Sequence, residues 1–408
     1  MLETPLSLHE RVKGNGLSDK CRGMKSVELV WSSDDLVIAG QPYTGFPILL
    51  WDSMESCVVA NQFFRHYLLR GAIGSKKSWP STGRALYDFF SFLQAHELEW
   101  RDVDRGEAKS LVAAYRDFCL RACKLAPTTI RQRLHYICKF YEYALSQRWV
   151  SRLPFCQDER TVKRETSFLA HVNASGGKAM ANDVMPRVHK ALPKFLTMAE
   201  VNALLRAAEN PHHRMMMLLA LHTGLRREEI ASFPLACVFD PDKAGRHERN
   251  YRIHLNPFDG SGMCTKGSKP RYIYVSRRFM TDLHRYVVQR RGERASLSKT
   301  PHQPLFLNQF GEPYAEDGKS LCRIIRDTGK RANVKAHTHM LRHTYATYTL
   351  ISLRSNPGSG IEPLVFLQRQ LGHSSIQTTM VYLHLVNELA DDVVLAYSDE
   401  LNDLAEEV

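Results

Sequence analysis

Paired cysteine motifs, long apolar runs and an N-terminal leader are all missing from this 408-residue sequence. Its nine cysteines include no repeated C-x-x-C pair, which disfavours both a disulfide framework and a zinc ribbon. The longest apolar run, Met215 to Leu221, is much too short to cross a bilayer. The first residues carry no basic stretch followed by an apolar one, as a signal peptide would. We therefore expect a soluble protein of a reducing intracellular compartment.

Acidic residues are too few to balance the basic ones, because 55 lysines and arginines face 43 aspartates and glutamates. The net charge of +12 and the pI near 9.2 favour a polyanionic partner, most commonly DNA or RNA. A basic protein without such a partner is the alternative. No carboxylate cluster suited to paired Mg²⁺ is visible, so no metal and no other cofactor is expected. The length predicts two or more domains.

Helical periodicity dominates the first half of the sequence. Residues 1–48 precede it and contain strand-like runs, which predict an N-terminal arm or a small β element of unassigned function. Residues 49–155 carry apolar stripes at helical spacing and predict a compact four-helix domain. Some of its basic side chains are candidates for contacts with phosphates, with ordinary solvated surface charge as the alternative for each. These candidates are Lys76, Lys77, Arg84, Arg131, Arg133 and Lys139.

Two stretches fall outside this periodicity. Residues 156–192 are rich in glycine and polar residues, which predicts a linker that holds at most a short helix. Residues 391–408 form an acidic tail with apolar residues at helical spacing. Such a tail suits docking on a partner subunit, or else folding back onto its own domain.

A second domain is expected over residues 193–390. Thr197 and Glu200 predict a capping box at the start of its first helix. Further on, the apolar period shortens to two, which predicts three short antiparallel strands before the helices return. These strands are expected at residues 237–239, 251–255 and 272–275.

Four short motifs in this second domain gather arginines, histidines and a tyrosine. They are T-G-L-R-R-E-E from Thr223 to Glu229, a basic turn around Lys266, H-M-L-R from His339 to Arg342, and L-G-H ending at His373 with Tyr382 nine residues later. Tyrosine has a pKa near ~10 and is a poor nucleophile unless neighbouring cations stabilise its anion. The motifs supply those cations, which indicates an enzyme that attacks a phosphodiester with a phenol.

In this order and spacing, the motifs resemble the tyrosine recombinase (phage integrase) family across residues 193–390. The helical domain at 49–155 resembles, more loosely, the core-binding domain of that family. The resemblance implies a mainly α fold with a small antiparallel β-sheet, arranged as a two-lobed clamp. Its lobes are an N-terminal helical core-binding domain and a mixed α/β catalytic domain.

The resemblance also implies roles for the motif residues. Tyr382 attacks the scissile phosphate and leaves a 3′-phosphotyrosine and a free 5′-hydroxyl. Arg226 and Arg342 present forked donors to the non-bridging oxygens of that phosphate. His373 donates a third hydrogen bond, and Glu229 orients the arginines.

Proton transfer is assigned in the same way. Lys266 is expected to be the general acid for the leaving oxygen, although Lys269 on the same turn is an alternative. His339 is expected to be the general base for the tyrosine, while His343 is interpreted as a structural hydrogen bonder. Lys269 and Arg271 join the predicted DNA-binding residues.

The predicted function is site-specific DNA recombination of the integrase or transposase type, without metal or ATP. The expected partners are duplex DNA with a specific site, a homo-oligomer of four subunits exchanging strands through a Holliday junction, and accessory proteins. The expected location is the cytoplasm, in association with the nucleoid. Two alternatives remain: DNA relaxation like that of a type IB topoisomerase, and sequence-specific DNA binding by a catalytically idle protein.

Overall fold

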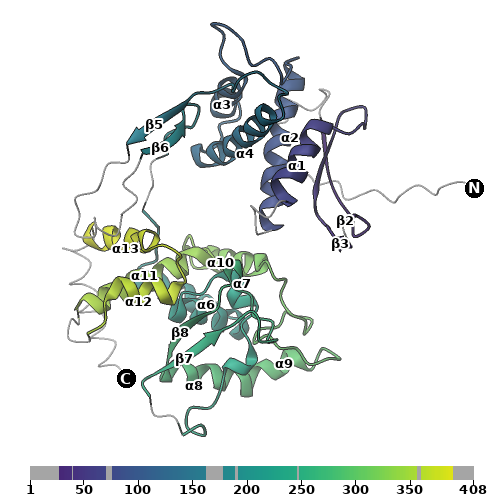
Figure 1. Ribbon diagram of the computed structural model, residues 1–408. Helices are drawn as coiled ribbons and strands as arrows, with labels where there is room; N and C mark the ends of the chain where they lie inside the picture. Colours follow the sequence, from purple (N-terminus) through teal and green to yellow (C-terminus); the bar gives the residue numbers. More distant parts are fainter. Residues whose placement is uncertain are drawn as a thin grey trace, which may run out of the picture. The chain divides into compact units, whose positions relative to one another are not determined.

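The computed structural model describes residues 27–38, 40–69, 76–161, 178–188, 192–245, 248–355 and 360–388. The chain divides into two compact units between Lys190 and Ala191, and each unit has its own hydrophobic core (Figure 1). Helices contribute more residues than strands in both units, and the described strands form four two-stranded antiparallel sheets. This confirms the predicted mainly α fold with small antiparallel sheets. Within the described ranges, no helix is long and apolar enough to span a bilayer.

The first unit contains the four predicted helices: α1 (Val58–Leu69), α2 (Trp79–Ala95), α3 (Leu111–Arg121) and α4 (Pro127–Ser146). Aromatic side chains fill the space between them, with Phe90 and Phe140 packed edge to face at 5.5 Å. The buried hydroxyl of Tyr141 donates to the Trp100 carbonyl at 2.9 Å. The ends follow local signals, since Ser110 caps α3 and Pro127 opens α4, where a missing N–H costs nothing.

A small β element covers α2, as predicted for the N-terminal region, but it extends beyond residue 48. Strand β1 (Glu28–Trp31) pairs with β4 (Pro47–Leu50), and β2 (Val37–Ile38) pairs with β3 (Gln41–Pro42). Val27, Phe46 and Leu49 belong to the core of the unit. The Asn61 side chain fixes Leu49 by bonding both its N–H and its carbonyl at 2.8 Å. Residues 1–26 lie outside the described residues.

The segment predicted as a linker carries a hairpin. Strand β5 (Gln157–Thr161) pairs with β6 (Lys178–Asn182) in antiparallel register, and no short helix lies in the described part of residues 156–192. Val184 then packs into the core of the first unit. The two strands are polar, so backbone hydrogen bonds hold them together without an apolar pattern that the sequence would reveal.

The second unit begins with the predicted capping box, in which Thr197 accepts from the Glu200 N–H and the Glu200 carboxylate accepts from the Thr197 N–H. Its core surrounds α6, which is apolar on nearly every side and packs against α11. The α-helices of the unit are α5 (Met198–Arg206), α6 (Pro211–Thr223), α7 (Arg227–Ala231), α8 (Arg277–Tyr286), α9 (Gly292–Ala295), α10 (Lys319–Arg331), α11 (Thr338–Ser355), α12 (Pro363–Leu371) and α13 (Ile376–Glu388). A π-helical segment, η5 (Val287–Arg291), joins α8 to α9.

Among the described residues of this unit, β7 (Asn250–Leu255) and β8 (Arg271–Ser276) pair as an antiparallel sheet. Its residues alternate between the core and the surface. The third strand predicted at residues 237–239 is wrong, because Leu235–Cys237 forms the 3-10 turn η3. A short apolar run fits a buried turn as well as a strand, and tertiary contacts decide between them. Here the Leu235 N–H donates to the Gln303 carbonyl and Leu235 and Cys237 face the core.

Candidate active site

One part of the site lies at the junction of α6 and α7. Gly224 ends α6 with φ of +65°, and a Cβ there would lie 2.5 Å from the Tyr345 ring. The glycine therefore allows both the left-handed turn and the close approach of α11. Arg226 then caps α7, and its N–H donates to the Glu229 carboxylate at 2.8 Å. The T-G-x-R-x-x-E motif thus fixes one arginine and one carboxylate side by side.

Glu229 organises the cations around it. Its side chain is 1% exposed and accepts from Arg226 at 3.2 Å and from both terminal nitrogens of Arg271 at 2.7 Å. Burial alone would raise the pKa of this carboxyl, but Arg271 and Arg226 hold the pKa below its usual value. Arg271 was predicted to bind DNA. Its guanidinium fork binds Glu229 and so helps to hold the site in shape, while DNA binding by Arg271 stays a prediction.

Arg342 enters the same region from α11. It is 3% exposed and donates to the carbonyls of Gly224 at 2.6 Å and Leu371 at 2.7 Å. Arg226 also donates to the Leu371 carbonyl, at 3.2 Å. Burial lowers the pKa of Arg342 to about 9, and the charge of Arg226 adds to this effect. Two guanidinium groups therefore converge on the C-terminal end of α12, where the helix dipole favours cations.

His373 follows α12 and joins this pair. Its Nε2 lies 3.1 Å from Arg342 Nη2, and its Nδ1 lies 2.9 Å from the Thr379 hydroxyl. Burial, and then the charges of Arg342 and Arg226, lower the pKa of His373 to about 3. The ring is therefore neutral at pH 7, with Nε2 accepting from the arginine. Helix α13, which carries Tyr382, packs beside α11 and α12 (Figure 1).

Tyr382 completes the cluster from α13, within the same chain. Its ring is 3% exposed and lies nearly parallel to the His373 ring, with centroids 6.3 Å apart. Burial raises the pKa of the phenol, while Arg342 and Arg226 oppose that rise. The structure thus brings the predicted nucleophile, both predicted arginines and His373 into one place.

The contact to the Tyr382 hydroxyl comes from His343 rather than from His339. His343 Nδ1 lies 2.8 Å from the phenolic oxygen, whereas the exposed His339 lies one helical turn earlier, with its ring 5.6 Å from that of His343. From the sequence, His343 was interpreted only as a structural hydrogen bonder. The doubled histidine in H-x-x-R-H was the available signal, but only the packing of α13 selects between the two rings.

The lysines of the hairpin turn remain at the surface. Lys266 begins the 3-10 turn η4 (Lys266–Ser268), which Gly267 closes with φ of +68°. Lys266 and Lys269 are both exposed. Neither is joined to the arginine cluster by a hydrogen bond or ion pair within the described residues.

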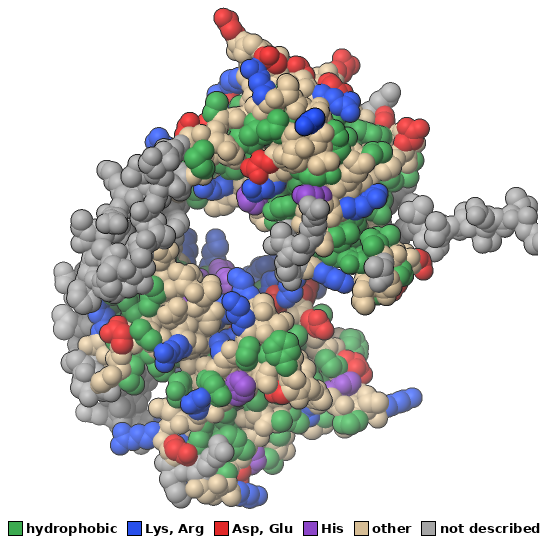
Figure 2. Space-filling view, viewed as in Figure 1, with side chains coloured by type: hydrophobic (Ala, Val, Ile, Leu, Met, Phe, Trp, Pro, Cys, Tyr) green, Lys and Arg blue, Asp and Glu red, His purple; other side chains and the backbone are tan. Residues whose placement is uncertain are grey.

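The predicted DNA-binding residues of the first unit differ in exposure. Arg133 pairs with the buried Asp88 at 2.8 Å, and Lys139 pairs with Glu142 at 2.6 Å. Burial raises the pKa of Asp88 to about 6, although Arg133 opposes the rise. The exposed side chains of this set are Lys76, Lys77, Arg84 and Arg131. Figure 2 shows lysine and arginine side chains over the surfaces of both units.

Comparisons with known proteins agree with this geometry. Residues 194–388 match the model of the phage integrase family. The tyrosine recombinase XerC of Lacticaseibacillus casei (strain BL23) is 26% identical over 309 residues, which covers 74% of this chain and 85% of that protein. Transposase A from transposon Tn554 of Staphylococcus aureus is 27% identical over 273 residues, which covers 64% of this chain and 67% of that protein.

Solved structures share the fold at low identity. The XerH site-specific recombinase bound to palindromic difH substrate has a TM-score of 0.51 and 16% identity, covering 79% of this chain and 80% of that one. The Tn1549 transposon integrase in complex with circular intermediate DNA has a TM-score of 0.53 and 17% identity, covering 79% of this chain and 94% of that one. Residues 194–388 of the second unit thus belong to the phage integrase family, which confirms the resemblance to tyrosine recombinases seen in the sequence motifs.

Proposed function

We propose that the protein is a site-specific DNA recombinase that cuts and rejoins DNA through a 3′-phosphotyrosine. One observation carries this proposal: Tyr382 lies beside Arg226, Arg342 and His373 within a single chain. Attack by the phenolic oxygen breaks the bond from phosphorus to the 5′-oxygen, with the phenol proton passing to His339 as general base and Lys266 protonating the leaving 5′-oxygen. The arginines stabilise charge on the non-bridging oxygens as the five-coordinate species forms. Because the covalent bond retains the energy of the broken linkage, a second 5′-hydroxyl can reverse the step.

Side chains supply all the charge that this chemistry requires. Arg226 and Arg342 act where other phosphoryl-transfer enzymes use metal ions; Glu229 holds Arg226, and the carbonyls of Gly224 and Leu371 hold Arg342. The reaction therefore needs neither a metal nor ATP. Lys76, Lys77, Arg84 and Arg131 are exposed and are assigned to the DNA backbone, which fits a cytoplasmic protein associated with the nucleoid.

A nicked suicide substrate tests the function. DNA from the flanks of the gene, nicked so that the 5′-product diffuses away, is expected to trap a covalent adduct without added metal or ATP. Peptide mapping of the adduct is expected to find the nucleotide on Tyr382. Attachment elsewhere would refute the assignment. Relaxation of supercoiled plasmids of any sequence by the monomer would favour the topoisomerase-like alternative, and tight binding without cleavage would favour the idle one.

The identity of the general acid gives a separate prediction. Lys266→Ala is expected to slow adduct formation about 10²- to 10⁴-fold, because the 5′-oxygen then leaves without a proton. A substrate with sulfur in that bridging position leaves as a thiolate and is expected to restore the rate. Lys269→Ala on the same exposed turn is the matched control. If Lys269→Ala shows the loss and the sulfur rescue instead, Lys269 is the acid.

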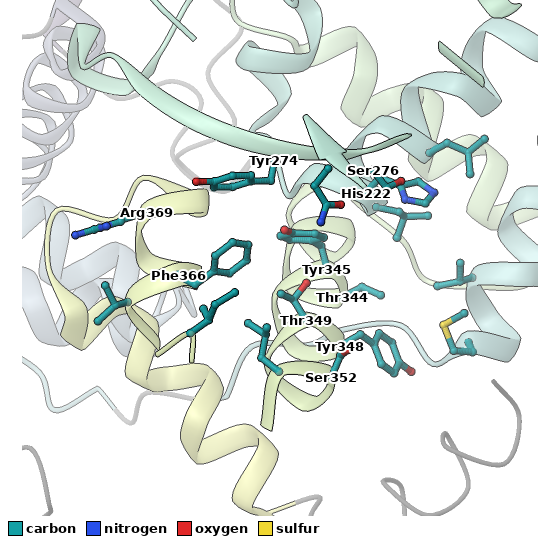
Figure 3. A pocket seen from close by; sticks show the side chains of 18 of the residues that line it. His222, Tyr274, Ser276, Thr344, Tyr345, Tyr348, Thr349, Ser352, Phe366 and Arg369 are labelled. Atoms are coloured by element: carbon teal, nitrogen blue, oxygen red, sulfur yellow. The ribbon is translucent and has the colours of Figure 1, made fainter. Parts of the chain in front are cut away.

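Assembly is assigned to the acidic tail. A groove of about 1020 Å³ on the second unit is lined largely by apolar and aromatic side chains, among them Tyr274, Tyr345, Tyr348 and Phe366 (Figure 3). Arg369 and Glu362 also line it, and the arginine offers a cation to an acidic ligand. We assign residues 391–408 of a neighbouring subunit to this groove, in a tetramer of two dimers on DNA.

Removal of residues 391–408 is expected to leave cleavage of the suicide substrate within about threefold, because the tail contributes no reacting group. Recombination between two sites is expected to fall at least about tenfold, with a smaller complex on DNA by light scattering. Ile361→Asp, at the rim of the groove and 46% exposed, is expected to reproduce this effect. An unchanged complex in both variants would contradict the docking.

A further inference from the structure

We propose that His343 positions the Tyr382 hydroxyl for attack by accepting its hydrogen bond. The inference rests on the proposed function and adds a residue that none of the motif assignments uses. The distance from His343 Nδ1 to the phenolic oxygen is 2.8 Å, and the two side chains come from α11 and α13. The contact therefore ties the nucleophile to the helix that carries Arg342.

The direction of this hydrogen bond follows from the protonation of the ring. Burial is the largest effect that lowers the pKa of His343, to about 4, and the charges of His339, Arg342 and His337 lower it further. The ring is therefore neutral at pH 7 and carries one N–H, which we assign to Nε2, so that Nδ1 offers its lone pair to the phenol. Tyr382 must then be the donor. Both lone pairs of its oxygen then stay free to bond phosphorus, whereas an N–H donor in this position would occupy one of them.

The same values argue against proton transfer to His343 in the resting site. Burial raises the pKa of Tyr382 above its usual value and lowers that of His343 to about 4, so the proton stays on the phenol. A neutral acceptor of the right shape is then sufficient for positioning. The alternative, an obligatory base, requires a group that can take up the proton.

Substitutions at position 343 separate these roles. Asparagine places its amide oxygen where His343 Nδ1 lies but does not take up a proton, whereas glutamine reaches instead toward the position of Nε2. His343→Ala and His343→Gln are expected to slow single-turnover adduct formation about 10- to 100-fold, because the Tyr382 hydroxyl is no longer held in the orientation for attack. His343→Asn is expected to stay within about threefold of the unchanged protein. DNA affinity and thermal melting are measured for each variant, and both are expected to be unchanged.

Three outcomes would overturn the inference. If His343→Ala cleaves at the normal rate, the contact has no role in attack. If His343→Asn is as slow as His343→Ala while folded and bound to DNA, the residue is a base and not a positioning group. If the losses vanish with the sulfur-bridged substrate, His343 acts on the leaving group. Failure of the proposed function itself is distinguishable, because no adduct on Tyr382 would then form in the unchanged protein.

Discussion

Tyr382→Phe is expected to abolish covalent adduct formation, with a loss of at least about 10⁴-fold. The change removes only the phenolic oxygen, and phenylalanine retains the buried ring beside His373. The neighbouring cations cannot compensate, because Arg226 and Arg342 carry no nucleophilic atom. Denaturing gel electrophoresis of the suicide-substrate reaction measures the loss.

Tyr272→Phe is the matched control for this prediction. Tyr272 lies on β8 in the same unit and is 42% exposed, so its hydroxyl is removed at the surface. This variant is expected to cleave normally. DNA binding by Tyr382→Phe is expected to persist, since the phosphate ligands are retained. An adduct that survived Tyr382→Phe would transfer the nucleophile to another residue.

Glu229→Gln is expected to lower the free energy of unfolding by about 3 kcal/mol, because it leaves buried positive charge without its counter-ion. The carboxylate is 1% exposed and binds Arg271 through two hydrogen bonds. Adduct formation is expected to fall as well, about 10²-fold, since Arg226 loses the group that orients it. Denaturant unfolding and single-turnover cleavage measure the two effects.

Glu228→Gln removes the same charge from the same turn of α7 and serves as the control, because Arg226 and Arg271 do not bind that carboxylate through any of the hydrogen bonds described above. Acid unfolding provides a further check on Glu229. Its pKa is lower in the folded protein than the usual 4.5, so its contribution is complete above pH 4.5 and is lost as the pH falls through the folded value. The Gln variant is expected to lack that part of the acid transition. Equal destabilisation by both variants would show that Glu229 has no special role.

The sequence predicts the catalytic centre better than its surroundings. Arg226, Arg342, His373 and Tyr382 meet because each motif combines a reacting group with a local device, such as the turn at Gly224, that fixes its direction. Such local turns are determined by a few neighbouring residues, so they can be predicted from the sequence.

Contacts between residues far apart in the sequence cannot be predicted in this way. Arg271 binds Glu229 only because β8 lies beside α7, and His343 meets Tyr382 only because α13 packs on α11. The polar hairpin of β5 and β6 depends on backbone bonds between segments that carry no apolar pattern. The strand predicted at 237–239 shows the opposite error, because Cys237 ends a 3-10 turn and Val238, although extended, belongs to none of the described sheets.

The sheet of β1 and β4 has one more consequence. A side chain added at Gly83 of α2 would meet Pro47 at 2.7 Å, so strand and helix are fitted without spare room. Leu49 is fully enclosed, and its backbone is clamped by the Asn61 amide. The β element is thus an integral part of the first unit and covers its helical core. A shortened protein that begins at α1 would lack β1 to β4, and aromatic side chains of the core would be exposed to water.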